Sequence, residues 1–144
     1  MISLKEATLV AIANGAENED EIARALSVSK EVVRKVIEEL KAEDYVREEL
    51  KGFWIFRRKV LRLTEKGFEL ASKTMKKLES LRNEIVKKIK DGDEDYLNNL
   101  MVSWSYIIPL LVWMNMLDLL LLGNFIGLAS EEFEDIEFGG EEVM

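Results

Sequence analysis

The side chains that could do chemistry in this chain are its charged ones, because cysteine and histidine are both absent from the 144 residues. Without histidine, the chain lacks the commonest general base and the commonest metal ligand. Without cysteine, it can form neither disulfides nor thiolate metal sites. The sequence also has no phosphate-binding glycine loop. We therefore expect a protein that binds a partner, not an enzyme, and we expect neither a metal site nor a cofactor.

The charge is distributed unevenly along the chain. All 20 Lys and Arg lie in residues 1–90 together with 16 acids, which gives that part a charge of +4. Residues 91–144 hold the other 12 of the 28 acids and no basic residue, hence −12. The net charge of −8 looks wrong for a protein that binds nucleic acid, but this asymmetry leaves a mildly basic front half.

Two short helices with one apolar face each are predicted between Asn18 and Leu40. Helical spacing relates Ile22, Ala23 and Leu26, and again Val33, Val36, Ile37 and Leu40. Asn18 with Glu21 is typical of a capping box, and Ser29 can cap the second helix. A helix that starts at Ser3 with Glu6 and ends at Gly15 precedes them. This order predicts a helix-turn-helix.

A β-hairpin and a long helix follow. Residues 45–63 are rich in β-branched, aromatic and aliphatic side chains, and Lys51-Gly52 suits a turn. Thr64 can cap a helix that runs from Glu65 to about Lys90, before the break at Asp91-Gly92-Asp93. Such a helix spans roughly 39 Å, so part of it should project from the head.

These pieces resemble the winged-helix transcriptional regulators of the MarR and PadR type. The matching stretches are SVSKEVVRKVIEELKAEDYV and, after the hairpin, RKVLRLTEKG, and the resemblance covers about residues 3–70. Family members usually carry glycine where this chain has Asp44, which puts the turn before the hairpin in doubt. The missing long N-terminal helix favours a PadR-like arrangement with dimerisation at the C-terminus.

The resemblance implies double-stranded DNA as the partner, with the second helix of the pair in a major groove. Arg34 is then the best candidate to contact guanine, and Ser29, Lys30 and Lys35 suit phosphates, with Glu31 on the same face. The hairpin would supply Lys51, Arg57, Arg58 and Lys59 to the flanking backbone or minor groove. The alternative is that these are solvated surface charges.

The sequence Phe53-Trp54-Ile55-Phe56 in the hairpin allows three interpretations. The favoured one is that the four side chains form hairpin core and cover the head. They could instead face a partner or the C-terminal helices, or form a wedge inserted between base steps.

Residues 96–122 form a second long apolar segment, without charge from Leu97 to Leu117. We interpret it as a helix buried by its own subunit and a symmetry mate. The alternative is a membrane-anchored DNA-binding protein in which 97–117 is a transmembrane helix. Polar residues and Pro109 within the run count against that alternative.

We therefore expect a mainly α protein with a small β-hairpin: a winged helix-turn-helix head and long C-terminal dimerisation helices. The expected divisions are 1–70 for DNA binding, 71–128 for dimerisation and 129–144 for an acidic tail. The expected function is that of a cytoplasmic, homodimeric, sequence-specific transcriptional regulator. A winged-helix module that binds protein is the competing class. The resemblance also admits a small aromatic effector, although no residue here identifies one.

Overall fold

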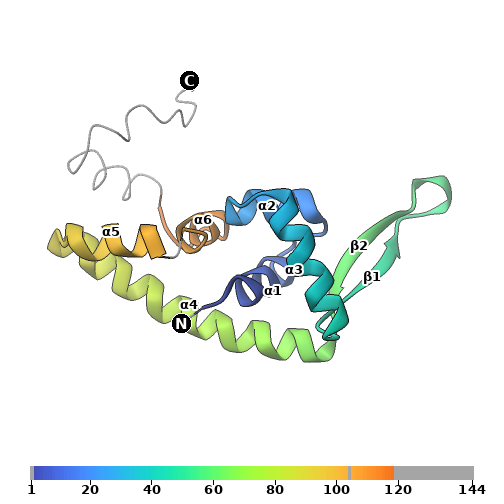
Figure 1. Cartoon of the computed structure of the whole chain (residues 1–144), viewed down its shortest axis with the longest axis horizontal. Coiled ribbons are helices and arrows are strands. Elements are labelled where there is room, and N and C mark those ends of the chain that lie inside the picture. The colour runs from blue at the N-terminus through green and yellow to red at the C-terminus, as the bar shows by residue number, and fades with distance from the viewer. Residues whose placement is uncertain (1, 104, 119–144) are drawn as a thin grey trace, which may run out of the picture.

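The structure, a computed structural model, describes residues 2–103 and 105–118 (Figure 1). The elements in chain order are α1 (Leu4–Ala13), α2 (Glu19–Leu26), α3 (Lys30–Ala42), β1 (Val46–Lys51), a 3-10 turn (Trp54–Phe56), β2 (Arg58–Leu63), α4 (Glu65–Asp91), α5 (Glu94–Ser103) and α6 (Ile107–Trp113). A helical chain with one two-stranded antiparallel hairpin confirms the predicted fold class.

Polar side chains fix the starts of the first two helices. The Ser3 hydroxyl accepts the Glu6 N–H and the Glu6 carboxylate accepts the Ser3 N–H, so the predicted capping box is present. At α2, Asn18 accepts the Glu21 N–H at 2.9 Å. The Glu21 carboxylate, however, accepts the N–H of Glu17 and not that of Asn18. The second capping box is therefore incomplete, because the Glu21 carboxylate binds the N–H one residue before the cap.

The core of the head lies where α1, α2 and α3 meet. Leu9 of α1, Ile22 and Leu26 of α2, and Leu40 of α3 are fully buried. The apolar faces predicted from helical spacing are therefore the faces that pack together. Burying four such side chains contributes on the order of 1.5–3 kcal/mol each.

The hairpin, called the wing below (residues 46–63), leaves the head at the end of α3. Its strands pair from Val46 opposite Leu63 to Lys51 opposite Arg58, which confirms the predicted hairpin. Val46 and Leu61 are buried against the head, whereas the far end of the wing extends away from it (Figure 1).

The turn before the wing keeps the conformation that glycine favours although an aspartate occupies it. Asp44 has φ +65°, in the left-handed region. Its carbonyl accepts the Thr64 hydroxyl at 2.7 Å, and Thr64 in turn caps α4 by accepting the Gly67 N–H. Gly67 lies so close to the Tyr45 backbone that a Cβ there would lie 3.0 Å from the Tyr45 carbonyl carbon. Aspartate at position 44, where family members usually have glycine, therefore leaves the conformation of the turn unchanged.

Helix α4 runs along one side of the molecule and packs mainly on α1, while its far end extends beyond the head (Figure 1). Gly92, at φ +72°, ends it as predicted. Helix α5 then folds back along α4, and α6 packs against α2 and α1. The Tyr106 hydroxyl donates to the Ile2 carbonyl at 2.8 Å and ties this C-terminal part to the other end of the described chain.

The described part of the apolar segment 96–122 forms two helices, contrary to our expectation of one long helix. α5 has 10 residues and α6 has 7, and Pro109 stands in the first turn of α6, where proline is tolerated. Within residues 2–103 and 105–118, no helix is both long and apolar enough to cross a membrane. The expected acidic tail, 129–144, lies outside the described residues.

Candidate nucleic-acid interface

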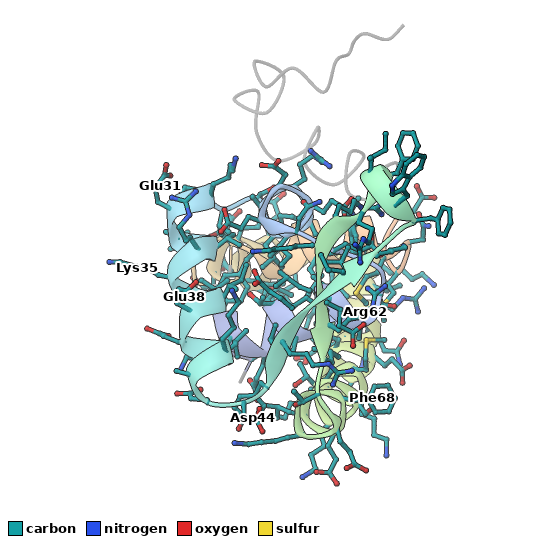
Figure 2. The ribbon with its side chains drawn as sticks, turned by 90° about the vertical axis from the view of Figure 1, so that its right-hand side faces the viewer. Glu31, Lys35, Glu38, Asp44, Arg62 and Phe68 are labelled. Atoms are coloured by element: carbon teal, nitrogen blue, oxygen red, sulfur yellow. The ribbon has the colours of Figure 1, made fainter. Side chains whose placement is uncertain are left out.

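The outer face of α3 carries charges of both signs. Ser29 caps the helix by accepting the Val32 N–H at 3.2 Å, so it is placed at the end of α3 where DNA contact was expected. Glu31, Lys35 and Glu38 lie along the outer side of the helix, away from the core (Figure 2). The exposed charged residues of α3 are Lys30, Glu31, Arg34, Lys35, Glu38 and Glu39. A phosphate backbone approaching this face would meet three cations and three acids.

Two of these cations are paired with acids at the start of α2. Lys30 Nζ lies 2.8 Å from Asp20 Oδ1, and the Arg34 guanidinium lies 3.2 Å from Glu19 Oε1. The hydrogen bond raises the pKa of Lys30 and lowers the pKa of Asp20. Lys35 has no ion pair with any residue that the structure describes. Lys35 is therefore the α3 cation most directly available to a partner.

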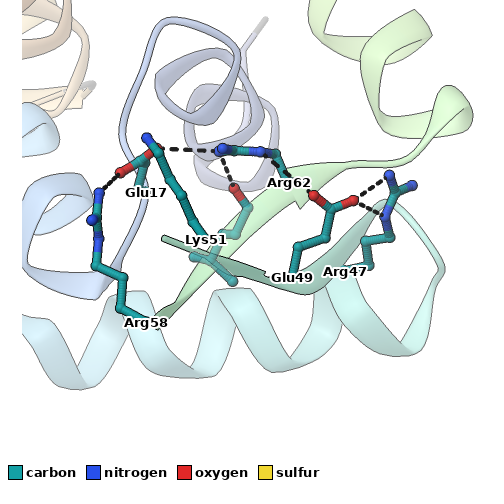
Figure 3. A network of polar contacts seen from close by, with 7 residues as sticks. Glu17, Arg47, Glu49, Lys51, Arg58 and Arg62 are labelled. Atoms are coloured by element: carbon teal, nitrogen blue, oxygen red, sulfur yellow. Dashed lines mark hydrogen bonds and ion pairs between the residues drawn. The ribbon is translucent and has the colours of Figure 1, made fainter. Parts of the chain in front are cut away.

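Three of the wing cations gather around one carboxylate, that of Glu17 in the loop before α2 (Figure 3). Lys51 lies 2.6 Å from it, Arg58 2.8 Å and Arg62 3.4 Å. The Leu61 N–H also donates to the Glu17 carbonyl at 2.9 Å. Hydrogen bonds from Lys51 and then Arg58 lower the pKa of Glu17 from its usual 4.5 to about 2. Glu17 therefore fastens the wing to the helix pair.

Of the remaining wing cations, Arg47 pairs with Glu49 at 2.6 Å, whereas Arg57 and Lys59 are exposed and have no ion pair with any described residue. α3 and the wing lie beside each other on the face shown in Figure 2. Of the nine predicted residues, five lie on α3 or at its start and four lie on the wing: Ser29, Lys30, Glu31, Arg34 and Lys35, and Lys51, Arg57, Arg58 and Lys59. Their contact with DNA stays a prediction, and four of them already have partners within the chain.

Sequence reasoning missed the acids that hold these cations. Glu19 and Asp20 follow the Asn18 cap in the first turn of α2. Acids are common in a first helical turn because they interact favourably with the helix dipole. The available signal was that the helix-turn-helix arrangement brings the start of α2 near the start of α3. Glu17, 34 residues before Lys51, offered no local signal.

The wing tip (residues 53–56) is exposed, and the interpretation of these residues as hairpin core is wrong. The exposed fractions are 82% for Phe53, 73% for Trp54, 73% for Ile55 and 74% for Phe56. The reason is geometric, because the tip lies beyond the part of the wing that contacts the head (Figure 1). At this exposure, the tip is not buried against the described C-terminal helices either.

A cavity of about 270 Å³ lies between the start of α2, α3 and the wing. Its lining includes Asp20, Lys30, Lys41, Glu48 and Lys59. Lys41 and Glu48 form an ion pair across it at 3.0 Å. Such a charged lining differs from the apolar wall that an aromatic effector requires. Within the described residues, no group of three or more acids could hold a metal ion.

No family model and no curated protein matches the chain. Solved structures of ZitR from Lactococcus lactis are similar to it. A single mutant of ZitR, with serine in place of a cysteine, has a TM-score of 0.50 and 19% identity, with 71% of each chain covered. A double mutant of the same protein has a TM-score of 0.50 and 20% identity, with 73% of each chain covered. ZitR is described as a zinc-responsive MarR family member. At this identity the likeness establishes the fold.

Proposed function

Since the chain has the winged-helix fold of a MarR-type regulator, we propose that it is a transcriptional regulator that binds double-stranded DNA. The observation that carries this proposal is the exposed basic set of Lys35, Arg57 and Lys59, placed on α3 and the wing of a fold used for DNA recognition. Major grooves admit an α-helix, and the wing would lie along the flanking backbone or the adjacent minor groove.

The proposal extends to a homodimer that reads a near-palindromic site. Two copies of α3 would enter major grooves about 34 Å apart, and the two-fold symmetry of the protein would be matched by that of the site. The C-terminal helices are the proposed dimerisation region. In support, Val102 of α5 is 84% exposed although it is apolar. Sedimentation of the purified chain tests this part directly, and a monomer at DNA-binding concentrations would contradict it.

The division of labour along the chain is also part of the proposal, with 1–70 for DNA contact and 71–128 for dimerisation. Helix α4 is continuous across residue 70, and its buried residues Ala71 and Leu78 join the core of the head. The first half of α4 therefore packs with the head, so the proposed boundary at residue 70 refers to function and not to separate folding units.

A second candidate is a winged-helix module that binds protein. It is favoured by the acids Glu31, Glu38 and Glu39 on the outer face of α3, which oppose a phosphate backbone. The two candidate functions predict different roles for Lys35, because only DNA binding would bring this side chain into contact with phosphates.

Fluorescence anisotropy of a labelled duplex distinguishes these candidates. We compare Lys35→Gln with Lys73→Gln, which removes the same charge from an exposed position of α4. DNA binding through α3 predicts that only the first variant weakens affinity, with a salt slope about 0.9 smaller. Equal effects of the two variants would contradict a role for α3, and absence of duplex binding at low salt would favour the protein-binding module.

A further inference from the structure

The wing tip has the features of an organised apolar projection. Gly52, at φ +105°, closes the turn so tightly that a Cβ there would meet the Phe56 carbonyl carbon at 3.2 Å. The Phe56 N–H donates to the Phe53 carbonyl at 3.0 Å, and the Arg57 N–H to the Trp54 carbonyl at 3.3 Å. Trp54 itself has φ +58°, a conformation rare for a bulky residue. A hydrogen-bonded turn thus holds four large apolar side chains in solvent.

The chain segment that carries the tip has basic residues and no acidic ones. From residue 50 to residue 64 the chain has no acid, and it has Lys51, Arg57, Arg58, Lys59 and Arg62. Lys51 and Arg58 stand directly behind the apolar side chains and share the Glu17 carboxylate, whereas Arg57 and Lys59 have no ion pair with a described residue. This order, apolar at the end and positive at the base, matches a partner with an apolar interior behind an anionic surface.

The dimensions of the wing suit duplex DNA. Six paired residues extend about 17 Å at the usual strand rise of ~3.4 Å per residue. The wing starts just after α3 ends. With α3 in a major groove, the adjacent minor groove lies about half of a ~34 Å helical turn away. The wing therefore has the length needed to bring its tip to that minor groove.

We propose that the wing tip is an apolar wedge that enters the minor groove, inserts between base pairs and bends the duplex. This inference rests on the proposed DNA-binding function and adds the mode of contact. Proteins that bend DNA from the minor groove do so with Phe, Leu, Ile or Met side chains placed between base steps. Trp54 and Phe53 would stack on the bases, while Arg57 and Lys59 would neutralise the phosphates on either side of the opened step.

Duplex DNA explains more of the surface than an anionic membrane does. A membrane would engage the tip and its cations but would leave the exposed Lys35 on α3 without a role. A duplex engages both, because α3 and the wing lie beside each other on one side of the molecule (Figure 2).

The test uses the full chain and duplexes of about 30 base pairs that contain flexible TA or CA steps. 2-Aminopurine placed at successive positions reports unstacking, and energy transfer between end labels reports bending. The tip variant combines Phe53→Ser, Trp54→Asn, Ile55→Ser and Phe56→Ser, with asparagine chosen because it tolerates positive φ. The control is Phe68→Ser, which removes an aromatic side chain that is 62% exposed on α4.

If the tip acts as a wedge, the wild type and the control should both bend the duplex. Both should also raise the 2-aminopurine fluorescence at one base step. The tip variant should bind about 10-fold more weakly and leave the duplex straight. Its melting temperature should equal that of the wild type, because the replaced side chains touch no core.

Other results would overturn the wedge in distinguishable ways. If the wild type binds and the tip variant binds equally, without bending in either case, the wedge is wrong and the proposed function stands. If the wild type binds no duplex, both the wedge and the proposed DNA-binding function are wrong. Tip-dependent binding to phosphatidylserine vesicles, or tip-dependent self-association, without a tip effect on DNA would assign the tip to a membrane or to a second copy instead.

Discussion

Neutralising the two acids at the start of α2 should strengthen DNA binding. Glu19 and Asp20 hold Arg34 and Lys30 at 3.2 Å and 2.8 Å, so these cations must exchange a carboxylate for a phosphate when DNA binds. The double variant Glu19→Gln/Asp20→Asn removes that competition and leaves side chains of nearly the same shape.

The expected size of the effect follows from the exposure of the two pairs. Each of the four side chains is about one third exposed or more, so solvent screens both pairs and each carboxylate competes only weakly with a phosphate. Removing both carboxylates should therefore raise the affinity for DNA by no more than roughly fivefold. If both released cations then pair with phosphates, the slope of log affinity against log salt steepens by up to about 1.8.

Anisotropy titrations of one duplex over a salt series measure both quantities. The control variant Glu69→Gln/Glu79→Gln removes the same two charges from exposed positions of α4. It separates release of the α3 cations from a general change of net charge. Unchanged or weaker binding of the Glu19/Asp20 variant, or an equal gain with the control, would refute the idea that these acids compete with DNA.

Three further predictions concern the elements that place α3 and the wing. Gly67→Ala should lower the free energy of unfolding by about 2 kcal/mol despite its better helix propensity, because its Cβ would overlap the Tyr45 backbone. Asp44→Gly should raise the free energy of unfolding by about 0.5–1 kcal/mol, because glycine occupies φ +65° without strain. Glu17 stabilises the fold above pH 4.5, and this contribution is lost as the pH falls towards 2, so Glu17→Gln should lower stability at neutral pH and flatten its acid dependence.

Urea denaturation checks the first two of these predictions, and acid titration followed by circular dichroism checks the third. Ser80→Ala, at an exposed position of α4, is the control for Gly67→Ala and should be neutral or slightly stabilising. A stable Gly67→Ala protein would contradict the close approach, and a destabilised Asp44→Gly protein would contradict the strain. An acid transition unchanged by Glu17→Gln would show that its carboxylate does not hold the wing.

Local patterns predicted the elements well because helix starts and apolar periodicity are local properties. Thr64 caps the helix that it was expected to cap, and the hairpin lies within residues 45–63 as predicted. Local patterns could not predict whether Phe53 and its neighbours at the tip are buried, because a hairpin can have the same apolar sequence in either case. Its exposure follows from the length of the wing relative to the head.

The pairing of charges could not be predicted from local patterns either. Glu17 contacts Lys51, Arg58 and Arg62 across separations of 34 to 45 residues, which only the fold determines. The same holds for the C-terminal segment. The absence of charge from Leu97 to Leu117 suggested one helix, whereas the described residues form α5 and α6, and α6 packs against α2 and α1. An interface therefore has to be judged by its ion pairs as well as by its exposed cations.

Sequence-specific binding of duplex DNA is the property on which the proposed function of this winged-helix chain depends. The most direct test incubates the purified full chain with pooled genomic duplex fragments over a salt series and sequences the retained fragments. We expect recovery of a two-fold symmetric motif whose retention falls as salt rises. Failure to retain duplex DNA even at low salt would contradict the proposed function.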